Sequence, residues 1–485
     1  MKDKLKNAFR IIYAGAVCCV LAVPSAVLIR SELQNPDADA EEVTAENRVL
    51  ADKPQLRTED GALNKDFTMQ YESWFSERFG LRTQLVTAYG KLTSKLFGVS
   101  SEKDVIIGRD GWLYFTPTIP DATGVRSLND AEIRHCVRNL QLMRDYAAQH
   151  GAAFVFAAAP NKASIYPDNL PARYLHTGSE NNLDALSDAL RQSDLTVCDW
   201  RTVLRDAAAS GDRQLYHKLD THWNGDGAML GYQTLMQTLS LDDRGYADAE
   251  RTETCDWEGD LWGMLSPAEQ NPDRNAVYAV PQTYRTIGRM RSIDDLSIKT
   301  ACDTGEGSLL MFRDSFGRAL IPLLAERFAS CTFQRANAIP LDMLETAPAD
   351  YVVYELVERN LQRLLTYAPR MPAPYAEIPA AEPADGAMPI RMESEQAGAY
   401  LHVYGLFDAA YDNADAVYLT VNGQTYEAFL ACEQEALELE QHQANGFSAY
   451  LPADSASGTV AVTVLSDGKW VQAGTAEIQL SDDAA

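Results

Sequence analysis

The feature that most restricts the fold is an alternation of short apolar runs and amphipathic segments between residues 130 and 368. A helix is predicted over 130–150, because Asn129 and Glu132 form a capping box and apolar residues then recur at helical spacing. Further helices are predicted near 181–192, near 201–209, over 227–239 and after Ser315. Buried strands are predicted at AAFVFAAAP, LTVCDW, SLLMF and CTFQ, and YVVYELVERNLQRLL passes from strand to helix. This pattern predicts a three-layer α/β domain with a mostly parallel sheet.

The regions on either side of this alternation differ from it in character. A helical layer is predicted over about 67–98, and a hairpin that turns at Asp110-Gly111 is predicted over 105–115. After about residue 370, helical spacing gives way to alternating runs joined at Asn422-Gly423 and Asp467-Gly468, which is typical of a small β-sandwich. We therefore expect five parts: a basic flank and transmembrane segment (1–30), an acidic tether (31–55), the α/β domain (56–370), a Pro- and Ala-rich linker (371–395) and a β-sandwich (396–485).

The N-terminal segment has the pattern of a membrane anchor. The basic sequence MKDKLKNAFR is followed by Ile11 to Ile29 without a charged residue. With a rise of about 1.5 Å per helical residue, this run and its apolar flank reach about 30 Å, the thickness of a bilayer core. A cleaved signal peptide is the alternative, but Pro24-Ser25-Ala26 is a poor cleavage site. We expect an uncleaved single-pass anchor in the cell membrane, with everything after it outside the cytoplasm.

Charge and cysteine spacing exclude several classes of function. The formal net charge of -27 repels phosphates, so nucleic acid and anionic lipid are not expected as main partners. No CxxC motif and no Cys/His spacing of a zinc site occurs among the eight cysteines. We therefore expect neither a metal nor a cofactor.

Ser315 is the candidate nucleophile. It directly follows the apolar strand SLLMF and Arg313-Asp314, and a helical pattern follows it. This position lies at the carboxyl edge of a parallel sheet, where ligands bind in α/β folds, and the helix start directs N–H groups towards the same point. The alternative is an ordinary helix N-cap, because serine is among the best capping residues.

Asp220 and His222, about ninety residues earlier, are the candidate orienting carboxylate and general base. A serine hydroxyl needs a base to accept its proton, and that imidazole needs a carboxylate to fix its tautomer. In an extended loop, side chains two residues apart point the same way, so one short segment can supply both groups. A metal site is the alternative, but it would require His217 to converge with these two residues, and no HExxH helix is present.

Further polar residues lie where they can contact a substrate. Asn161 and Lys162 follow a second predicted strand and can donate to an oxyanion or a sugar, although a solvated turn also explains them. Trp223 and Asn224 directly follow His222 and are candidate substrate contacts.

Two other groups of residues do not belong to the candidate triad. Glu355 and Arg359 have the spacing of a surface ion pair on a helix. Trp257 and Trp262, among carboxylates in the long connection 241–307, suit either the rim of a sugar site or the core.

These segments carry a family resemblance. GRDGWLYF, PNKASIYPDNLP, DTHWN, MFRDSFGRALIP and DYVVYELVER resemble, over most of residues 60–368, the DHHW or alginate O-acetyltransferase-like branch of the SGNH hydrolase superfamily. The resemblance implies an SGNH-like fold and a triad of Ser315, His222 and Asp220, with Asp-x-His before the serine in the chain. One departure is Arg313, which stands where the superfamily usually has the glycine of Gly-Asp-Ser. It either orients the substrate or pairs with an acid at the end of the strand.

The resemblance also implies a function. We expect an extracytoplasmic serine O-acetyltransferase that modifies a cell-envelope or secreted polysaccharide through an acetyl-serine intermediate. If water resolves the intermediate, the protein is a carbohydrate acetylesterase; if the triad is inactive, it is a glycan-binding or assembly protein. The implied partners are a polysaccharide acceptor and a multipass membrane O-acyltransferase that donates acetyl.

Overall fold

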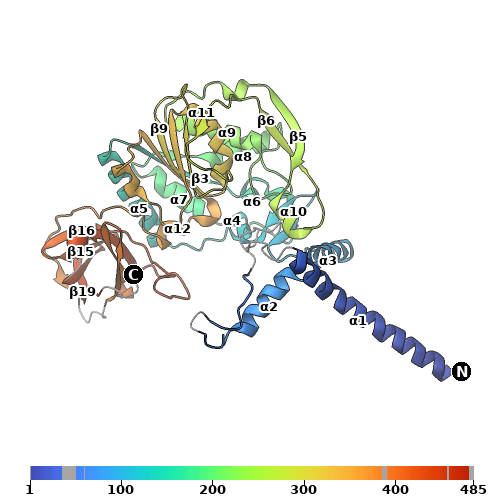
Figure 1. Ribbon diagram of the computed structural model, residues 1–485. Helices are drawn as coiled ribbons and strands as arrows, with labels where there is room; N and C mark the ends of the chain where they lie inside the picture. The colour runs from blue at the N-terminus through green and yellow to red at the C-terminus, as the bar shows by residue number, and fades with distance from the viewer. Residues whose placement is uncertain (1, 35–50, 59–60, 385–389, 456–457, 480–485) are drawn as a thin grey trace.

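The computed structural model describes residues 2–34, 51–58, 61–384, 390–455 and 458–479. It shows an α/β body, a strand-rich C-terminal region and an N-terminal helix that extends away from both (Figure 1). Most of the tether predicted over 31–55 and part of the linker predicted over 371–395 lie outside the described residues.

A seven-stranded sheet forms the centre of the α/β body, in the order β4-β3-β11-β9-β10-β8-β7. The five strands from β4 to β10 are parallel, and β8 and β7 add an antiparallel edge. The bounds are β3 (Ala153–Ala159), β4 (Val197–Cys198), β7 (Arg285–Thr286), β8 (Ser297–Ala301), β9 (Ser308–Phe312), β10 (Ser330–Gln334) and β11 (Tyr351–Val357). The predicted mostly parallel sheet is confirmed, and β9 covers the predicted residues.

Helices cover both faces of this sheet, which confirms the predicted three layers (Figure 1). One face packs against α8 (Trp200–Ser210), α9 (Gly225–Thr238) and α11 (Ile321–Arg327). The other face packs against α5 (Asp130–Gln149), α7 (Asn182–Arg191) and α12 (Arg363–Thr366). Side chains alternate between the two cores along each strand: Val155 and Met311 belong to the first, and Phe154 and Leu310 to the second.

Two hairpins and several short helices surround the carboxyl edge of the sheet. The predicted hairpin of β1 (Val105–Ile107) and β2 (Leu113–Phe115) is present, and Asp110 and Gly111 at its turn both have positive φ. A second hairpin, β5 (Arg251–Trp257) with β6 (Asp273–Tyr278), encloses α10 (Asp260–Leu265). The shorter helices are α4 (Ile119–Ala122), α6 (Lys162–Ile165), η1 (Thr116–Thr118), η2 (Pro167–Asn169), η3 (Tyr246–Asp248), η4 (Phe316–Leu320), η5 (Leu341–Glu345) and η6 (Glu358–Asn360).

The C-terminal region consists of two sheets that enclose a separate apolar core. One sheet has the order β12-β19-β18-β15-β16 and the other the order β13-β14-β17. The bounds are β12 (Glu382–Pro383), β13 (Arg391–Ala397), β14 (Tyr400–Leu406), β15 (Ala416–Val421), β16 (Gln424–Ala428), β17 (Gly446–Pro452), β18 (Thr459–Ser466) and β19 (Lys469–Glu477), with η7 (Ala409–Tyr411) and η8 (Ala453–Ser455) between strands. Arg138 of α5 forms two hydrogen bonds with Glu427 of β16, which joins this region to the α/β body.

The N-terminal part contains α1 (Lys2–Gln34), α2 (Phe67–Arg78) and α3 (Arg82–Phe97), and the last two form the predicted helical layer. Across the described residues, no helix meets the length and apolarity that a bilayer crossing requires. The transmembrane anchor predicted for this end of the chain is therefore not confirmed.

Candidate active site

The segment 215–224 forms a closed loop before α9. Asn224 donates its backbone N–H to the carbonyl of Leu215, and His217 donates to the carbonyl of His222, at 2.9 and 3.2 Å. Asn224 then caps α9, because its side-chain oxygen accepts the N–H groups of Asp226 and Gly227. The loop therefore holds residues 217–222 in one defined conformation at the carboxyl edge of the sheet.

Asp220 binds His222 directly. His222 Nδ1 lies 2.7 Å from Asp220 Oδ1, which also accepts the backbone N–H of His222 at 2.9 Å. Burial opposes the ionised form of Asp220, but the positive charge and hydrogen bond of His222 outweigh it and lower the carboxyl pKa. An ionised carboxylate only accepts hydrogen bonds, so Nδ1 carries the hydrogen and Nε2 is the free acceptor. This is the tautomer that a general base requires.

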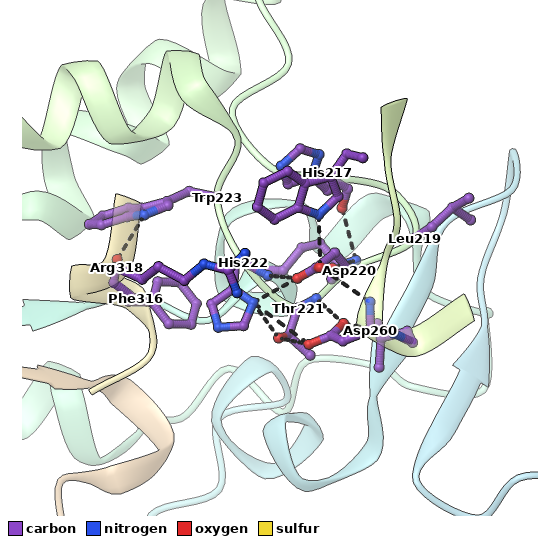
Figure 2. A network of polar contacts seen from close by, with 12 residues as sticks. His217, Leu219, Asp220, Thr221, His222, Trp223, Asp260, Phe316 and Arg318 are labelled. Carbon is purple, nitrogen blue, oxygen red and sulfur yellow. Dashed lines mark hydrogen bonds and ion pairs between the residues drawn. The ribbon is translucent and has the colours of Figure 1, made fainter. Parts of the chain in front are cut away.

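The other oxygen of Asp220 is held by the β5–β6 segment. Trp257 donates its indole N–H to Asp220 Oδ2 at 2.9 Å. The backbone N–H of Asp260 donates to the same atom at 3.2 Å, and Figure 2 shows Asp260 beside Asp220. Gly259 lets α10 approach this closely, because a Cβ there would lie 2.2 Å from the carbonyl oxygen of Leu219. Both oxygens of the orienting carboxylate therefore have partners.

Asp220, His222 and Asp260 could together hold a metal ion, since one ligand atom from each lies within 4.8 Å of the others. Protein donors already occupy these atoms. Asp260 accepts the N–H and the hydroxyl of Thr221 at 2.8 and 2.6 Å, and His222 presents to the cluster the same Nδ1 that binds Asp220. Burial and the nearby charge of Asp220 raise the pKa of Asp260. The cluster therefore matches the orienting side of a triad better than a metal site.

Lys162 supports this loop from behind. Its buried ammonium donates to the backbone carbonyls of His217, Lys218 and Asp220, and it lies 5.6 Å from the ring centroid of Trp112. Burial lowers its pKa to about 8. Lys162 is not among the residues that line the cavity beside His222. Its position therefore indicates a positioning residue, in place of the predicted contact with an oxyanion or sugar.

Asn161 and Arg313 are also buried away from that cavity. Asn161 donates to the carboxylate of Asp121 at 2.9 Å. Arg313 donates to three backbone carbonyls, those of Ile293, Asp295 and Asp314. Arg313 therefore has neither of the two predicted roles, contact with the substrate or pairing with an acid. It joins two loops through these backbone hydrogen bonds.

Trp223 and Asn224, by contrast, do line the cavity. Trp223 also donates its indole N–H to the carbonyl of Phe316 at 3.2 Å, so it joins the Asp-x-His loop to the Ser315 turn.

The turn around Ser315 is held by two buried carboxyl groups. Asp314 accepts the N–H of Phe316 at 2.8 Å and the N–H of Val357 at 2.6 Å. Glu355 accepts the N–H groups of Asp314 and Gly317, at 2.9 and 3.2 Å. Burial and the adjacent Asp314 raise the pKa of Glu355 well above its ordinary value.

The backbone N–H of Ser315 differs from the other N–H groups of this turn because it has no acceptor among the described residues. Its neighbours at 314, 316 and 317 each donate to a carboxyl group, whereas no described residue accepts from the N–H of Ser315. Its side chain makes no capping hydrogen bond at the start of η4, so the alternative of an ordinary N-cap does not account for it. Both the hydroxyl and the N–H of Ser315 are therefore available to a ligand.

Ser315 and His222 line the same cavity, which has a volume of about 340 Å³. The imidazole of His222 lies between Asp220 and the ring of Phe316, whose centroid is 4.9 Å away (Figure 2). His222 Nε2 is buried and has no hydrogen-bond partner among the described residues, so the imidazole and the Ser315 hydroxyl are not bonded to each other in this structure. The cavity gives the two groups a common space in which a carbonyl carbon can be placed.

Asp260 was not identified from the sequence as a site residue. Trp257 was a candidate for the rim of a sugar site or for the core, and it lines the cavity, but its contact with Asp220 was not predicted. Both residues come from the long connection 241–307 and contact Asp220 from about forty positions away in the chain. The predicted surface pair is wrong: Glu355 is buried in β11, and Arg359 lies over the ring of Phe316 at 5.5 Å. Helical spacing does not apply there, because the strand continues to Val357.

Comparison with known proteins identifies related sequences. Residues 105–296 match a family model described as "SGNH hydrolase-like domain, acetyltransferase AlgX", a range that contains Asp220 and His222 and ends before Ser315. A protein named probable alginate O-acetylase AlgJ from Pseudomonas putida is 27% identical over 212 residues, which are 42% of this chain and 52% of that protein. Its counterpart in Pseudomonas fluorescens is 25% identical over 224 residues, 43% of this chain and 53% of that protein. The chain thus spans about half the length of these curated relatives.

Solved structures were also compared. Bacillus cereus PatB1 with a sulfonyl adduct has a TM-score of 0.41 at 16% identity, over 54% of this chain and 97% of that chain. The O-acetyltransferase domain of Pseudomonas putida AlgJ has a TM-score of 0.35 at 20% identity, over 53% of this chain and 91% of that chain.

The prediction of an SGNH-type O-acetyltransferase or esterase agrees with the names of the related sequences. The resemblance of this chain to the AlgX- and AlgJ-type branch of the SGNH hydrolase superfamily is thereby confirmed.

Proposed function

We propose that this chain is a serine acyltransferase that moves an acetyl group onto a hydroxyl of a cell-envelope or secreted polysaccharide. One observation carries the proposal: a cavity is shared by Ser315 and by the unpartnered Nε2 of an imidazole whose Nδ1 is fixed on Asp220. The names of the related sequences support the acetyl group and the polysaccharide.

The reaction proceeds in two balanced steps. Ser315 Oγ bonds to the acetyl carbonyl carbon while His222 Nε2 takes the hydroxyl proton; the bond from that carbon to the leaving group then breaks, and the proton passes to the leaving group. In the second step a sugar hydroxyl attacks the acetyl-serine, His222 takes its proton, and the proton returns to Ser315 as the acetyl leaves. The charge on Asp220 stabilises the imidazolium in both steps.

The oxyanion that forms on the carbonyl oxygen needs N–H donors. The N–H of Ser315 is suited to this because no described residue accepts from it, whereas Asp314 and Glu355 accept the neighbouring N–H groups. Donors that are fixed before the reaction stabilise the transition state without a reorganisation cost.

We also propose that the site works outside the cytoplasm, at the membrane, where a multipass O-acyltransferase supplies acetyl. The basic N-terminal sequence before the uncharged run Ile11 to Ile29 supports this orientation. Helix α3 supports a location near the membrane, because it exposes apolar side chains on one side and carries basic but no acidic residues: Leu85, Tyr89, Leu92 and Leu96, with Lys91 and Lys95. Fractionation of cells, with protease added to intact spheroplasts, tests this placement; a protein that stays in the soluble cytoplasmic fraction would contradict it.

The activity is tested with p-nitrophenyl acetate as the acetyl donor and a short oligosaccharide with free hydroxyls as the acceptor. The wild type is expected to release p-nitrophenol and to yield acetylated oligosaccharide, whereas Ser315→Ala does neither. Acetate alone would show that water resolves the intermediate and that the protein is an esterase. Equal rates for wild type and Ser315→Ala would refute the proposal and leave a glycan-binding role.

A further inference from the structure

The cavity extends well beyond Ser315 and His222. Beyond these two residues, the cavity walls come from α9, from η4 and α11, and from the segment after β6. Most of the residues there are apolar: Ala228, Met229, Val280, Ala319, Pro322 and Leu323, with Gln282 after β6 and Arg318 in η4 as polar exceptions.

The order of residues along the two helices gives the direction of this apolar part. Helix α9 begins three residues after His222, and η4 begins directly after Ser315. Met229 and Leu323 come seven and eight residues after these two groups. Because an α-helix rises about 1.5 Å per residue, α9 carries its wall about 6 Å from Gly225 to Met229, and η4 with the first turn of α11 carries the other wall from Phe316 to Leu323.

A second part of the cavity, around Trp257, is more polar. Trp257 donates to Asp220, stacks on His217 with ring centroids 4.5 Å apart, and has the guanidinium of Arg318 5.3 Å from its centroid. A sugar hydroxyl finds partners in this part, but between the apolar walls it would be buried without them. The two parts of the cavity therefore suit chemically different parts of a substrate.

The cavity is also far larger than an acetyl group. A water molecule takes up about 30 Å³ of liquid, and an acetyl group, with three heavy atoms, on the order of two to three times that. The cavity measures about 340 Å³, which is within the range for binding small organic ligands.

We propose that the apolar part of the cavity binds the acyl chain of the substrate, and that the protein transfers, besides acetyl, acyl groups of about four to eight carbons. This inference rests on the proposed function and extends the range of acyl groups that it transfers. The chemistry stays the same: the acyl carbonyl carbon exchanges its bond to the leaving oxygen for a bond to Ser315 Oγ, and the hydroxyl proton passes through His222 to the leaving oxygen. The chain of that acyl group lies between α9 and α11.

The first test is a series of p-nitrophenyl esters from acetate to decanoate, hydrolysed by the full chain. Each methylene that becomes buried contributes roughly a fourfold factor to binding. We expect kcat/KM to be at least about tenfold higher for hexanoate than for acetate and to fall again for decanoate, which exceeds the cavity. A series in which acetate is the best substrate would overturn the inference while leaving the proposed function intact.

Variants that narrow the cavity then test where the acyl chain binds. Ala319→Phe fills the apolar part from η4, and Val280→Phe fills it from the opposite wall, outside regular secondary structure. Each is expected to lower kcat/KM for hexanoate at least tenfold and for acetate less than threefold. The matched control is Ala209→Phe, on an exposed position of α8, which should change neither. Equal losses for both esters in both variants, with unchanged melting temperatures, would contradict the assignment.

A binding measurement separates this inference from the proposed function. The Ser315→Ala protein is titrated with hexanoate and with acetate, and binding is followed by calorimetry. Hexanoate should bind at least tenfold more tightly, and Ala319→Phe in the same background should remove the difference. If no ester is hydrolysed but hexanoate binds in this way, the proposed chemistry fails and the acyl site stands. If hexanoate does not bind better than acetate, the acyl site fails.

Discussion

The two halves of the candidate site, the Asp-x-His loop and the Ser315 turn, are held by buried groups of opposite kind. In the loop, the ammonium of Lys162 and the indole of Trp257 donate to oxygens and fix residues 217–220. In the turn, the carboxyl groups of Asp314 and Glu355 accept N–H groups. Among the described residues, Nε2 of His222 in the loop and the N–H of Ser315 in the turn have no hydrogen-bond partner.

This comparison shows how a fold can leave particular polar groups without hydrogen-bond partners. A buried polar group without a partner costs free energy, so neighbouring groups are normally paired. Here Asp220 binds Nδ1 of His222, and Asp314 and Glu355 accept the N–H groups on both sides of Ser315, so Nε2 and the Ser315 N–H stay available for a substrate. Substitutions of Ser315 and of the groups that support each half therefore test the two halves separately.

Ser315→Ala removes the nucleophile from the turn and should have the largest effect. We expect kcat for ester hydrolysis to fall at least about 10³-fold with an unchanged melting temperature, because no other group forms the acyl intermediate. Ser330→Ala, at an exposed serine that begins β10, is the matched control and should retain full activity. A Ser315→Ala enzyme with more than a tenth of the wild-type rate would contradict the assignment.

Asp220→Asn weakens the loop half by removing the charge that orients His222. We expect kcat to fall by roughly 10²- to 10⁴-fold, because the wrong tautomer becomes accessible. Asp256→Asn, on an exposed position of β5, is the control and should change kcat little. A loss of less than about fivefold in Asp220→Asn would show that this carboxylate does not orient the base.

The pH dependence of kcat/KM tests the contact between Asp220 and His222. Burial alone would lower the pKa of His222, but Asp220 outweighs it and raises that pKa above 6.5. The base acts as the neutral imidazole, so kcat/KM should rise with pH through a midpoint above 6.5 and be lost as pH falls. In Asp220→Asn the residual activity should show this midpoint at lower pH. A wild-type midpoint below 6 would contradict the ion pair.

Lys162→Met removes the support behind the loop and should have an intermediate effect. Three backbone carbonyls lose a charged donor, so we expect the protein to be destabilised by about 2–4 kcal/mol and kcat to fall about 10- to 100-fold with little change in KM. Lys218→Met, which removes one hydrogen bond to the carbonyl of Asp110, is the matched control and should cost less than about 1 kcal/mol. A change in KM alone would favour a substrate contact for Lys162 over a positioning role.

Glu355→Gln should have the smallest effect, and it tests the turn half. The raised pKa of Glu355 favours the neutral acid, and glutamine keeps an oxygen that accepts the N–H groups of Asp314 and Gly317. We expect less than about a fivefold loss in kcat for Glu355→Gln, but a destabilisation of about 2–4 kcal/mol for Glu355→Ala, measured by denaturant unfolding. Equal effects of the two substitutions would mean that the acceptor oxygen does not hold the turn.

Local patterns predicted the parts of the fold that depend on short stretches of chain. The strand SLLMF, the capping box at Asn129 and the hairpin at Asp110-Gly111 are each set by a few neighbouring residues, and each is present. The alternation of these elements also predicted the carboxyl edge where Ser315 and the Asp-x-His loop meet. The antiparallel strands β7 and β8 were missed, because they lie in an irregular connection without clear periodicity.

The supports of the site could not be predicted in the same way. Position at a strand end does not say which way a side chain points, and Lys162 turns behind the loop while Ser315 faces the cavity. The contact of Asp260 with Asp220 depends on the close approach of α10 at Gly259, which is a tertiary feature. The candidate catalytic residues were therefore visible in the sequence, whereas those that hold them in place required the fold.

The central claim is that Ser315 becomes acylated in the cavity that it shares with His222. The most direct measurement is rapid acid quench of the protein mixed with p-nitrophenyl acetate and with p-nitrophenyl hexanoate, followed by peptide mass spectrometry. We expect a single acyl group on the peptide that contains Ser315 in the wild type, and none in His222→Ala under the same conditions. Turnover with no acyl group on this peptide, or with the acyl group on another residue, would contradict it.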